Sequence, residues 1–427
     1  MLDIKFIREH KEIVERAIKN KKVKEEIDLD KLISLYDERK EIRQRIDEIN
    51  VQKKEAASTQ NIEQGRILKE KSSELDAMFL EKEKEFMRLM LLIPNIPSPD
   101  TPIGKDDTEN KVLRQIGEKP QFSFAPKPHW ELGESLGVID KEKAAEMSGA
   151  RFAFLKGDLA LLQFALIQFA MEVLTDSERI EVIAKEAGIE TSFKAFLPII
   201  PPTMVKPAVL NRMGRLDPKE DKYYIESDDV YLTGSSEHSM GALHMDEIIP
   251  REELPKRYIG YSTCFRREAG TYGKDTKGIL RMHQFDKLEM ETFCLPENSQ
   301  QEQNLLVAIQ EHVMQKLKLP YEVMLVCTGD MGTPDYRQID INTWMPGQDT
   351  YRETHSSDLN TSFQSRRLNT RYKREDGTSE HVHMNDATLF AIGRMMIAIM
   401  ENYQQEDGTI RIPEVLQKYM GNKQVIE

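Results

Sequence analysis

Two segments near the N-terminus carry the same seven-residue repeat and constrain the fold more than any other feature. Residues 29–58 (LDKLISLYDERKEIRQRIDEINVQKKEAAS) contain neither glycine nor proline. One seam consists of Leu35, Arg39, Ile42, Ile46 and Ile49, and the other of Leu75, Phe79, Lys82, Phe86, Leu89 and Ile93. Both seams alternate spacings of four and three residues, as coiled coils do. The polar stretch STQNIEQG (58–65) between them predicts a turn, so we expect an antiparallel helical hairpin.

A proline-rich stretch follows the second seam. The sequence IPNIPSPDTPIGKDD places four prolines between Pro94 and Pro102. Proline cannot continue a helix and stiffens an extended chain, so this stretch predicts a linker. A chain of 427 residues is long enough for two or three domains. We therefore expect an N-terminal domain at 1–108 and a second domain at 109–427.

The net charge of −13 excludes a protein that is basic over its whole surface. A local basic patch is compatible with this total. Basic residues gather near the expected turn, at Lys53, Lys54, Arg66, Lys69 and Lys71, where they could contact phosphates. On the heptads alone, a dimerisation coil is the favoured interpretation of these helices.

Cysteine spacing and hydropathy limit the compartment. Cys264, Cys294 and Cys327 form no CxxC pair, which argues against a disulfide framework or a structural zinc site and fits a reducing cytoplasm. We expect all three to be core residues. The N-terminus is charged throughout, and we find no run of about 18 uncharged apolar residues. We therefore expect a cytoplasmic protein with no membrane partner.

Four segments after residue 110 show regular periodicity. Residues 158–172 predict a buried helix, and residues 196–205 predict a strand that meets a Pro-Pro break. Residues 389–403 (LFAIGRMMIAIMENY) predict a helix. Residues 285–294 alternate as a strand does, which puts Phe285, Lys287, Glu289, Glu291 and Phe293 on one face.

The densest polar cluster is CFRREAGTYGKDTKGILRMHQFDKLEME (264–291), which predicts a strand, a glycine-rich loop and a second strand. Arg266 and Glu268 are two residues apart and should share a face. A sheet face with arginine, lysine and carboxylates makes a poor core, because burying unpaired charges costs several kcal/mol each. It suits an anionic, planar ligand beside a zwitterion, although a salt-bridged solvent face is the alternative.

This cluster resembles the second signature motif of class II aminoacyl-tRNA synthetases, in the form found in the seryl-tRNA synthetase family. Further stretches agree, namely KPHWELGESLGVID, ARFAFLKGDLALLQFAL, MPGQDTYRE, FQSRRLNTRY and AIGRMMIAIMENYQ. The resemblance covers the whole chain in order. It implies an α+β fold, in which a coiled-coil arm that binds tRNA(Ser) precedes a catalytic domain with an antiparallel β-sheet flanked by helices. It also implies a homodimer, with Pro202 at the interface.

The resemblance assigns residues to ATP and to Mg²⁺. Arg266 and Arg394 match the catalytic arginines that hold the α- and γ-phosphates. Glu268 matches the carboxylate that reads the adenine amino group, and Phe285 the ring on which adenine stacks. Glu353 and Ser356 match the Mg²⁺ ligands. The remaining positions expected to contact ATP are Arg267, Met282, His283, Gln284, Thr354 and His355.

The resemblance also assigns an amino-acid pocket for L-serine. Its residues are Ser235, Ser236, Glu237, Arg266, Glu289 and Thr388. Three positions depart from the family pattern: Ser235 stands where threonine is usual, His355 lies beside the metal ligands, and Asp386 replaces an asparagine. An added acid and a cation near the pocket could retune affinity or mark an altered choice of amino acid.

The activity implied is ATP-dependent activation of serine followed by its transfer to the 3′ end of tRNA(Ser). The resemblance does not decide whether tRNA(Sec) is also a substrate. Three alternatives are a synthetase-like paralogue with altered amino-acid specificity, a non-catalytic dimeric RNA-binding protein, and a ligase that loads a carrier protein. The presence of Arg266 and Arg394 disfavours the second alternative, and the coiled arm disfavours the third.

Overall fold

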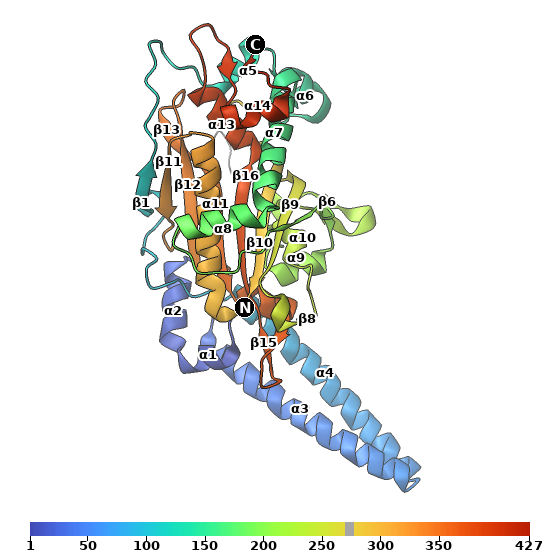
Figure 1. Cartoon of the computed structure of the whole chain (residues 1–427). Helices are drawn as coiled ribbons and strands as arrows, with labels where there is room; N and C mark the ends of the chain where they lie inside the picture. The colour runs from blue at the N-terminus through green and yellow to red at the C-terminus, as the bar shows by residue number, and fades with distance from the viewer. Residues whose placement is uncertain (270–276) are drawn as a thin grey trace. The chain divides into compact units, whose positions relative to one another are not determined.

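The computed structural model describes residues 1–269 and 277–427 of the chain (Figure 1). It divides into two compact units, Met1–Ile96 and Pro97–Glu427. The chain after Pro97 is tied to the second unit, because Ser98 N donates to Tyr336 O at 2.6 Å and Asp100 pairs with Arg337 at 2.8 Å. The boundary expected near residue 108 thus lies inside the second unit.

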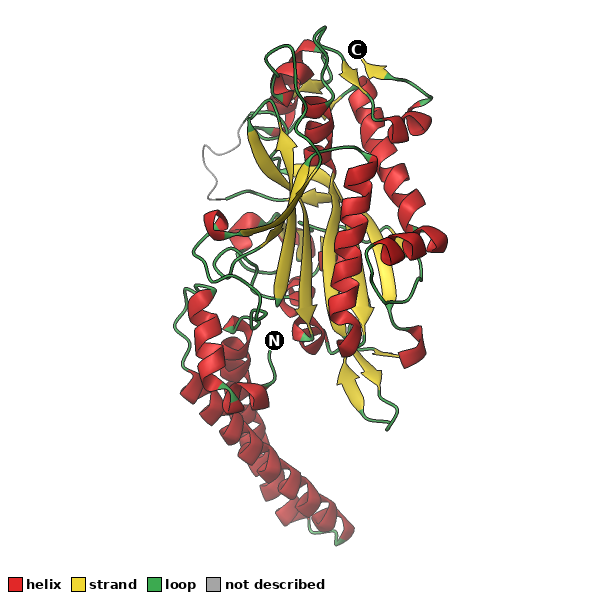
Figure 2. Cartoon of the chain, turned by 60° about the vertical axis from the view of Figure 1, so that its left-hand side comes forward, coloured by secondary structure: helices red, strands yellow, loops and turns green. Residues whose placement is uncertain are grey.

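The first unit is helical. Its elements are α1 (Ile4–Glu9), α2 (Lys11–Asn20), α3 (Leu29–Ser58) and α4 (Ile62–Leu92). The long helices α3 and α4 lie side by side, which confirms the predicted hairpin (Figure 2). The turn is shorter than expected, because Asn61 caps α4 by accepting a hydrogen bond from Gln64 N. Gly65 therefore lies inside the first turns of α4.

The seam between α3 and α4 is thin but specific. Most of its aliphatic members are buried, with Ile42 7% and Ile46 4% exposed, whereas Ile49 and Leu75 are half-buried. The polar members reach across the hairpin: Arg39 pairs with Glu83, and Lys82 Nζ lies 2.6 Å from Glu38. The Arg39 guanidinium also lies 3.9 Å from the centre of the Phe86 ring. These cross-helix pairs fix the register of the hairpin.

An eight-stranded sheet forms the centre of the second unit, in the order β1-β11-β12-β13-β16-β10-β9-β4. The strands are β1 (Lys111–Ile116), β11 (Tyr321–Leu325), β12 (Arg337–Met345), β13 (Thr350–Thr361), β16 (His383–Ala391), β10 (Gln284–Cys294), β9 (Lys256–Phe265) and β4 (Leu197–Ile199). All neighbouring pairs are antiparallel except β4 with β9. This confirms the predicted antiparallel sheet.

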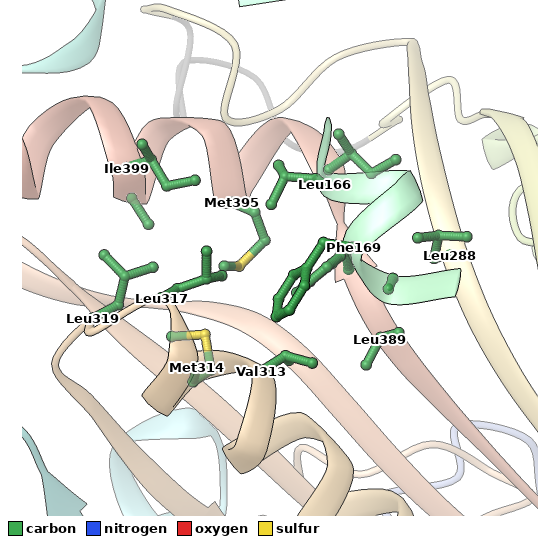
Figure 3. Close-up of a cluster of buried hydrophobic side chains, with 14 of the residues drawn as sticks. Leu166, Phe169, Leu288, Val313, Met314, Leu317, Leu319, Leu389, Met395 and Ile399 are labelled. Atoms are coloured by element: carbon green, nitrogen blue, oxygen red, sulfur yellow. The ribbon is translucent and has the colours of Figure 1, made fainter. Parts of the chain in front are cut away.

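Helices cover one face of this sheet and form the main core (Figure 3). They are α7 (Gly157–Leu174), α8 (Ser177–Glu186), α11 (Ser299–Lys316) and α13 (Ile392–Asn402). Leu288 and Leu389 of the sheet meet Phe169 of α7 and Met395 of α13, all at most 3% exposed. Helix α7 is long and apolar enough to cross a membrane by composition alone, but here its inner side is part of this core.

The opposite face of the sheet is covered by shorter elements. These are α9 (Pro207–Met213), α10 (Glu237–Met240), α12 (Phe363–Leu368) and the small sheet β8 (Ile248–Ile249), β14 (Arg371–Lys373) and β15 (Ser379–His381). A second core lies here and includes Phe293 and Met384. The alternation predicted for β10 is confirmed, because Leu288 and Met290 belong to the first core and Phe293 to the second.

The remaining elements are short. They are α5 (His129–Ser135), β2 (Ile139–Asp140), α6 (Lys141–Ser148), β3 (Phe154–Leu155), β5 (Met204–Val205), β6 (Tyr224–Ile225), β7 (Val230–Leu232), β17 (Ile410–Arg411), α14 (Glu414–Gln417) and β18 (Val425–Ile426). Cys264, Cys294 and Cys327 are all buried, as expected of core residues. The helix expected at 389–403 begins only at Ile392, because Phe390 and Ala391 still pair with β10 at the end of β16.

Candidate active site

An open cleft of about 980 Å³ lies in the second unit, over the face of the sheet opposite the main helical core. Strands β10, β13 and β16, the segment that follows β9 and the start of α13 contribute side chains to it. Its charged lining residues are Arg215, Glu237, Arg266, Glu268, Arg281, Lys287, Glu289, Glu353, Asp358, Asp386 and Arg394. The cleft therefore gathers both signs of charge from segments that are far apart in the sequence.

Arg266 and Arg394 enter this same cleft from different elements. Arg266 follows the last residue of β9, and its Nε donates to Gly234 O at 3.0 Å. Its guanidinium lies 5.3 Å from the centre of the Phe285 ring. Arg394 stands in the first turn of α13, where its Nη1 donates to Glu353 O at 2.7 Å. Both cations are therefore held in place before any ligand arrives.

Glu268 lines the cleft, but not for the reason that strand alternation gave. Strand β9 ends at Phe265, and Glu268 has a left-handed backbone with φ of 52°. Its Oε2 accepts a hydrogen bond from Arg281 Nη1 at 2.6 Å. The turn and the arginine, rather than a strand, orient this carboxylate. The glycine-rich loop expected after it lies largely at 270–276, outside the described residues.

Some of the residues assigned to ATP lie away from the cleft. Met282 lines it, whereas Arg267, His283 and Gln284 do not. His283 Nδ1 lies 2.9 Å from Arg266 O, so the imidazole braces the backbone of the arginine. Arg267 is exposed, with its guanidinium 5.9 Å from the Tyr223 ring.

The deep end of the cleft carries a network around Glu289. Lys287 forms an ion pair with Glu289, and its Nζ donates to Ser235 Oγ at 3.1 Å. The hydroxyls of Ser235 and Thr388 each donate to Glu289 Oε2 at 3.4 Å. Burial, together with the negative charge of Glu237, raises the pKa of Glu289 against the opposing effect of Lys287. Ser235, Glu289 and Thr388, which were expected in the amino-acid pocket, thus lie together, although Ser235 stands behind the lining residues.

Glu237 is neutralised by Arg215, which sequence analysis did not select. The two side chains approach to 2.5 Å. Burial raises the pKa of Glu237, but the positive charge of Arg215 outweighs this and lowers it to about 2. Ser236 instead bonds the backbone, with its Oγ 3.4 Å from Gly260 O. No periodic pattern marks Arg215, because it lies in the loop that follows α9.

Three carboxylates form a row across three neighbouring strands beneath this end. Glu291 of β10 is opposite Asp386 of β16, and Asp386 is opposite Asp358 of β13. Asp386 and Asp358 line the cleft, whereas Glu291 lies deeper and is fully buried. Burial, followed by neighbouring carboxylates, raises the pKa of all three well above the ordinary range.

The segment Glu353–Ser356 divides between the two faces of the sheet. Glu353, Thr354 and Ser356 line the cleft. His355 does not: it is fully buried, its ring 5.9 Å from that of Phe390 and its Nδ1 2.8 Å from Thr354 Oγ1. Burial lowers the pKa of His355 to about 3, so this side chain is neutral and supplies no cation to the cleft.

Oxygen donors surround Ser356. Its Oγ lies 3.2 Å from Asp358 Oδ1 and accepts from Gln338 Nε2 at 3.3 Å. Glu353 stands on the same strand and is half-exposed to the cleft. Hydroxyl and carboxylate oxygens are the ligands that Mg²⁺ prefers, so this donor set fits that ion.

Comparisons with known proteins agree along the whole chain. Residues 1–97 match the seryl-tRNA synthetase N-terminal domain, and residues 222–403 match the tRNA synthetase class II core domain (G, H, P, S and T). A serine–tRNA ligase of Bacillus cereus (strain G9842) is 45% identical over 365 residues, which are 85% of this chain and 82% of that protein.

Two solved structures are similar over the full length. The seryl-tRNA synthetase from Pyrococcus horikoshii complexed with ATP has a TM-score of 0.86 at 33% identity, covering 100% of this chain and 99% of that one. The cytoplasmic serine–tRNA ligase from Naegleria fowleri in complex with AMP has a TM-score of 0.83 at 28% identity, with the same coverage. The chain, with its helical arm and its charged cleft over an antiparallel sheet, therefore belongs to the seryl-tRNA synthetase family of class II aminoacyl-tRNA synthetases.

Proposed function

We propose that this protein is a serine–tRNA ligase, which activates L-serine with ATP and transfers it to the 3′ end of tRNA(Ser). The observation that carries the proposal is the convergence of Arg266 and Arg394 on one cleft that also holds Glu268, Phe285 and Glu289. Fixed cations suit phosphates, an aromatic ring suits a base, and a carboxylate suits an ammonium group. The ligands named for the similar solved structures, ATP and AMP, support this assignment.

The nucleotide would occupy the outer part of the cleft. Adenine stacks on Phe285, and Glu268 accepts from its amino group. Arg266 holds the α-phosphate and the serine carboxylate, because a planar guanidinium can bridge both. Arg394 holds the γ-phosphate. Met282 contributes apolar contact to the base.

Glu353 and Ser356 would hold Mg²⁺. Asp358 lies behind them and accepts a hydrogen bond from the hydroxyl of Ser356. The ion, when bound, neutralises charge between the phosphates. Arg394 is 3.3 Å from Glu353 Oε1, so the cation of the protein and the metal ligand are already adjacent.

Activation would be an in-line displacement. A carboxylate oxygen of serine attacks the α-phosphorus, the bond to the bridging oxygen breaks, and pyrophosphate leaves with Arg394 on its terminal phosphate. Arg266 stabilises the charge that develops on the α-phosphate. Glu289 and Glu237 hold the serine ammonium and hydroxyl, together with Thr388. Positioning and electrostatics suffice, so no side-chain nucleophile is needed.

Transfer would follow in the same cleft. A hydroxyl of the terminal adenosine of the tRNA attacks the carbonyl carbon of the adenylate, and AMP departs. The hairpin of the first unit would hold the tRNA through its backbone and shape. Lysines at the tip support this role, because the half-buried Lys53 and the exposed Lys69 line a shallow groove with Ala56 and Ala57.

The catalytic unit would act as a homodimer in the cytoplasm. Apolar side chains around Pro202 are open to solvent in the single chain, with Leu197 59%, Ile200 84% and Met204 57% exposed. Such a patch is typical of a subunit interface. The cytoplasmic location stays a prediction.

The decisive experiment is ATP–pyrophosphate exchange with each of the twenty amino acids, followed by charging of tRNA(Ser). We expect exchange that depends on L-serine, and serine that is linked to tRNA through a base-labile ester. Exchange with a different amino acid alone would refute the serine assignment. The absence of exchange with every one of them would refute the activation step itself.

A further inference from the structure

The amino-acid end of the cleft gathers more carboxyl groups than cationic side chains among the described residues. The oxygens of Glu237, Glu289 and Asp386 lie within 4.8 Å of one another. Arg215 neutralises Glu237, and Lys287 neutralises Glu289. Asp386 forms no ion pair of its own among the described residues: the charge of Arg215 reaches it, but that arginine is already paired with Glu237. Its Oδ2 accepts a hydrogen bond from the neutral amide of Asn360 at 2.6 Å.

Glu291 supplies a second, independent observation, an unpaired buried carboxyl group. It is 0% exposed, and both of its carboxylate oxygens lack a hydrogen-bond partner among the described residues. Strand alternation puts it on the same face as Glu289, directly across from Asp386. Leaving a buried polar group unpaired costs about 1–3 kcal/mol, so a protein retains one where something else compensates.

Asp358, the third carboxyl group of the row, supports the same conclusion. Asp358 stands across from Asp386 on the other side, and the hydrogen bond that reaches it comes from the neutral hydroxyl of Ser356. Asp358 and Asp386 both line the cleft, so a ligand seated against Glu289 can reach them. A positively charged group on the ligand would relieve this row, whereas a hydroxyl would not.

We propose that the pocket accepts 2,3-diaminopropionate as well as serine. This amino acid carries a second ammonium group on its β-carbon. This inference rests on the proposed activation of an amino acid in this cleft. 2,3-Diaminopropionate has the skeleton of serine with an ammonium in place of the hydroxyl, so it needs no extra space. Longer diamino acids carry the charge further and would press against the buried floor of Thr388 and Glu289.

The chemistry of activation is unchanged by this replacement. The amino-acid carboxylate still attacks the α-phosphorus and pyrophosphate still leaves, because the side chain takes no part in either bond change. The acidic row would favour the protonated side chain of the ligand. Selectivity then depends on charge, and a tenfold change in kcat/KM corresponds to about 1.4 kcal/mol.

The test compares pyrophosphate exchange by the full-length protein with L-serine, L-2,3-diaminopropionate and L-2,4-diaminobutyrate. We expect kcat/KM for 2,3-diaminopropionate within about tenfold of that for serine, and a much lower value for the longer homologue. Exchange with serine and with neither diamino acid would overturn the inference while leaving the proposed function intact. No exchange with any of them would overturn the proposed function.

Variants separate charge from structure. Asp386→Asn removes the charge and retains the shape, so we expect kcat/KM for 2,3-diaminopropionate to fall at least tenfold more than for serine. Glu291→Gln should act in the same direction without touching the ligand, and it serves if Asp386→Asn does not fold. Glu322→Gln, at a buried carboxylate of β11 outside the cleft, is the matched control and should change neither ratio.

A bound metal is the competing explanation for the acids. Elemental analysis of the purified protein, without added metal, should find no stoichiometric transition metal. A stoichiometric metal that Asp386→Asn releases, together with no exchange on 2,3-diaminopropionate, would overturn the inference. Equal losses for both amino acids in Asp386→Asn would overturn it as well, because a merely structural aspartate would act so.

Discussion

The hairpin and the cleft use charge in opposite ways. In the hairpin, charged residues at and beside the seam have partners on the opposite helix, as in Arg39 with Glu83, Lys82 with Glu38 and Lys31 with Glu85. At and beneath the floor of the cleft, Asp386 and Glu291 form no ion pair among the described residues, and the one arginine whose charge reaches both, Arg215, is already paired with Glu237. The first arrangement is complete in the protein alone. The second is completed only by a ligand.

The difference has an energetic side. Exposed ion pairs such as Lys31 with Glu85 contribute roughly 0–1 kcal/mol each, so the hairpin gains register rather than much stability from them. Buried carboxylates at the floor of the cleft destabilise the free protein unless they bind a proton or a cation. The carboxyl groups of the cleft therefore lower the folding stability of the free protein and favour binding of a cationic ligand. The charged residues of the hairpin have no such effect.

The largest expected effect comes from removing a cation of the cleft. Arg266→Ala should lower kcat/KM for serine-dependent pyrophosphate exchange by at least about 10²–10³-fold, because a fixed donor at the developing charge is lost. Arg267→Ala should cost far less, since that neighbour lies outside the cleft. Initial-rate assays of pyrophosphate exchange on both variants measure the difference in kcat/KM. Equal losses would show that the two arginines do not differ in the way that their positions require.

The next effect isolates the arm. Replacing residues 47–74 by a short glycine-serine turn removes the tip lysines and arginine. It retains the cross-pairs of Arg39 and Lys82 and the buried base of the hairpin around Phe86 and Leu89. We expect tRNA charging to fall by at least about tenfold at physiological salt, because phosphate contacts are lost. Serine-dependent exchange should change less than about twofold.

The tip deletion has a matched control. Lys53→Gln with Lys69→Gln removes charge and leaves the helices in place, so it should weaken charging less than the deletion and flatten its dependence on salt. Charging that survives the deletion unchanged would remove the tRNA-binding role from the tip. A parallel loss of exchange would mean that the two units do not act separately.

A third prediction compares the two cores. Leu288→Ala creates a cavity in the large core beneath the cleft, where Leu288 is 0% exposed, and should cost about 3–5 kcal/mol. Ile46→Ala acts in the thin seam, which can collapse around the lost methyls, and should cost about 2 kcal/mol. Chemical denaturation followed by circular dichroism gives both values. A larger cost in the hairpin would contradict the difference in packing.

How far the sequence could predict these regions follows from the same contrast. The hairpin rests on a local repeat, so Leu35, Ile42 and Phe86 could be placed without any knowledge of the rest of the chain. The two faces of β10 were predictable for the same reason. Helix α13 was predicted three residues too early, because apolar residues at the end of β16 continue the helical pattern without a break.

The cleft could be predicted only in part. The family resemblance brought Arg266, Arg394 and Glu289 together, but strand alternation gave the wrong reason for Glu268, whose left-handed turn leaves no sequence signal. His355 was expected beside the metal ligands, yet β13 turns it into the core. Arg215 and the row of carboxylates depend on loop paths and on register between strands. Neither is encoded in local spacing.

The smallest expected effect concerns an ion network on the surface of the catalytic unit. Glu172 of α7 bonds to Lys418 at 2.6 Å, to the hydroxyl of Tyr419 and to Arg179 at 2.5 Å. The contact with Lys418, followed by those with Tyr419 and Arg179, lowers the pKa of Glu172 from 4.5 to about 2. The charge of Glu172 is thus balanced by neighbouring cations, as in the hairpin pairs. Its pKa shift is opposite in sign to those of the carboxyl groups at the cleft.

The sign of the pH dependence follows from these directions. A carboxylate with a lowered pKa in the folded state contributes stability above pH 4.5, and this contribution is lost as the pH falls toward about 2. Glu172→Gln should therefore lower Tm slightly at neutral pH and leave it unchanged near pH 2, while Asp386→Asn should raise Tm at neutral pH, since it removes an acid with a raised pKa. Thermal unfolding of both variants across this range tests the pair. Tm shifts of the same sign for the two variants at neutral pH would contradict the distinction between carboxyl groups that are paired with cations and those that are not.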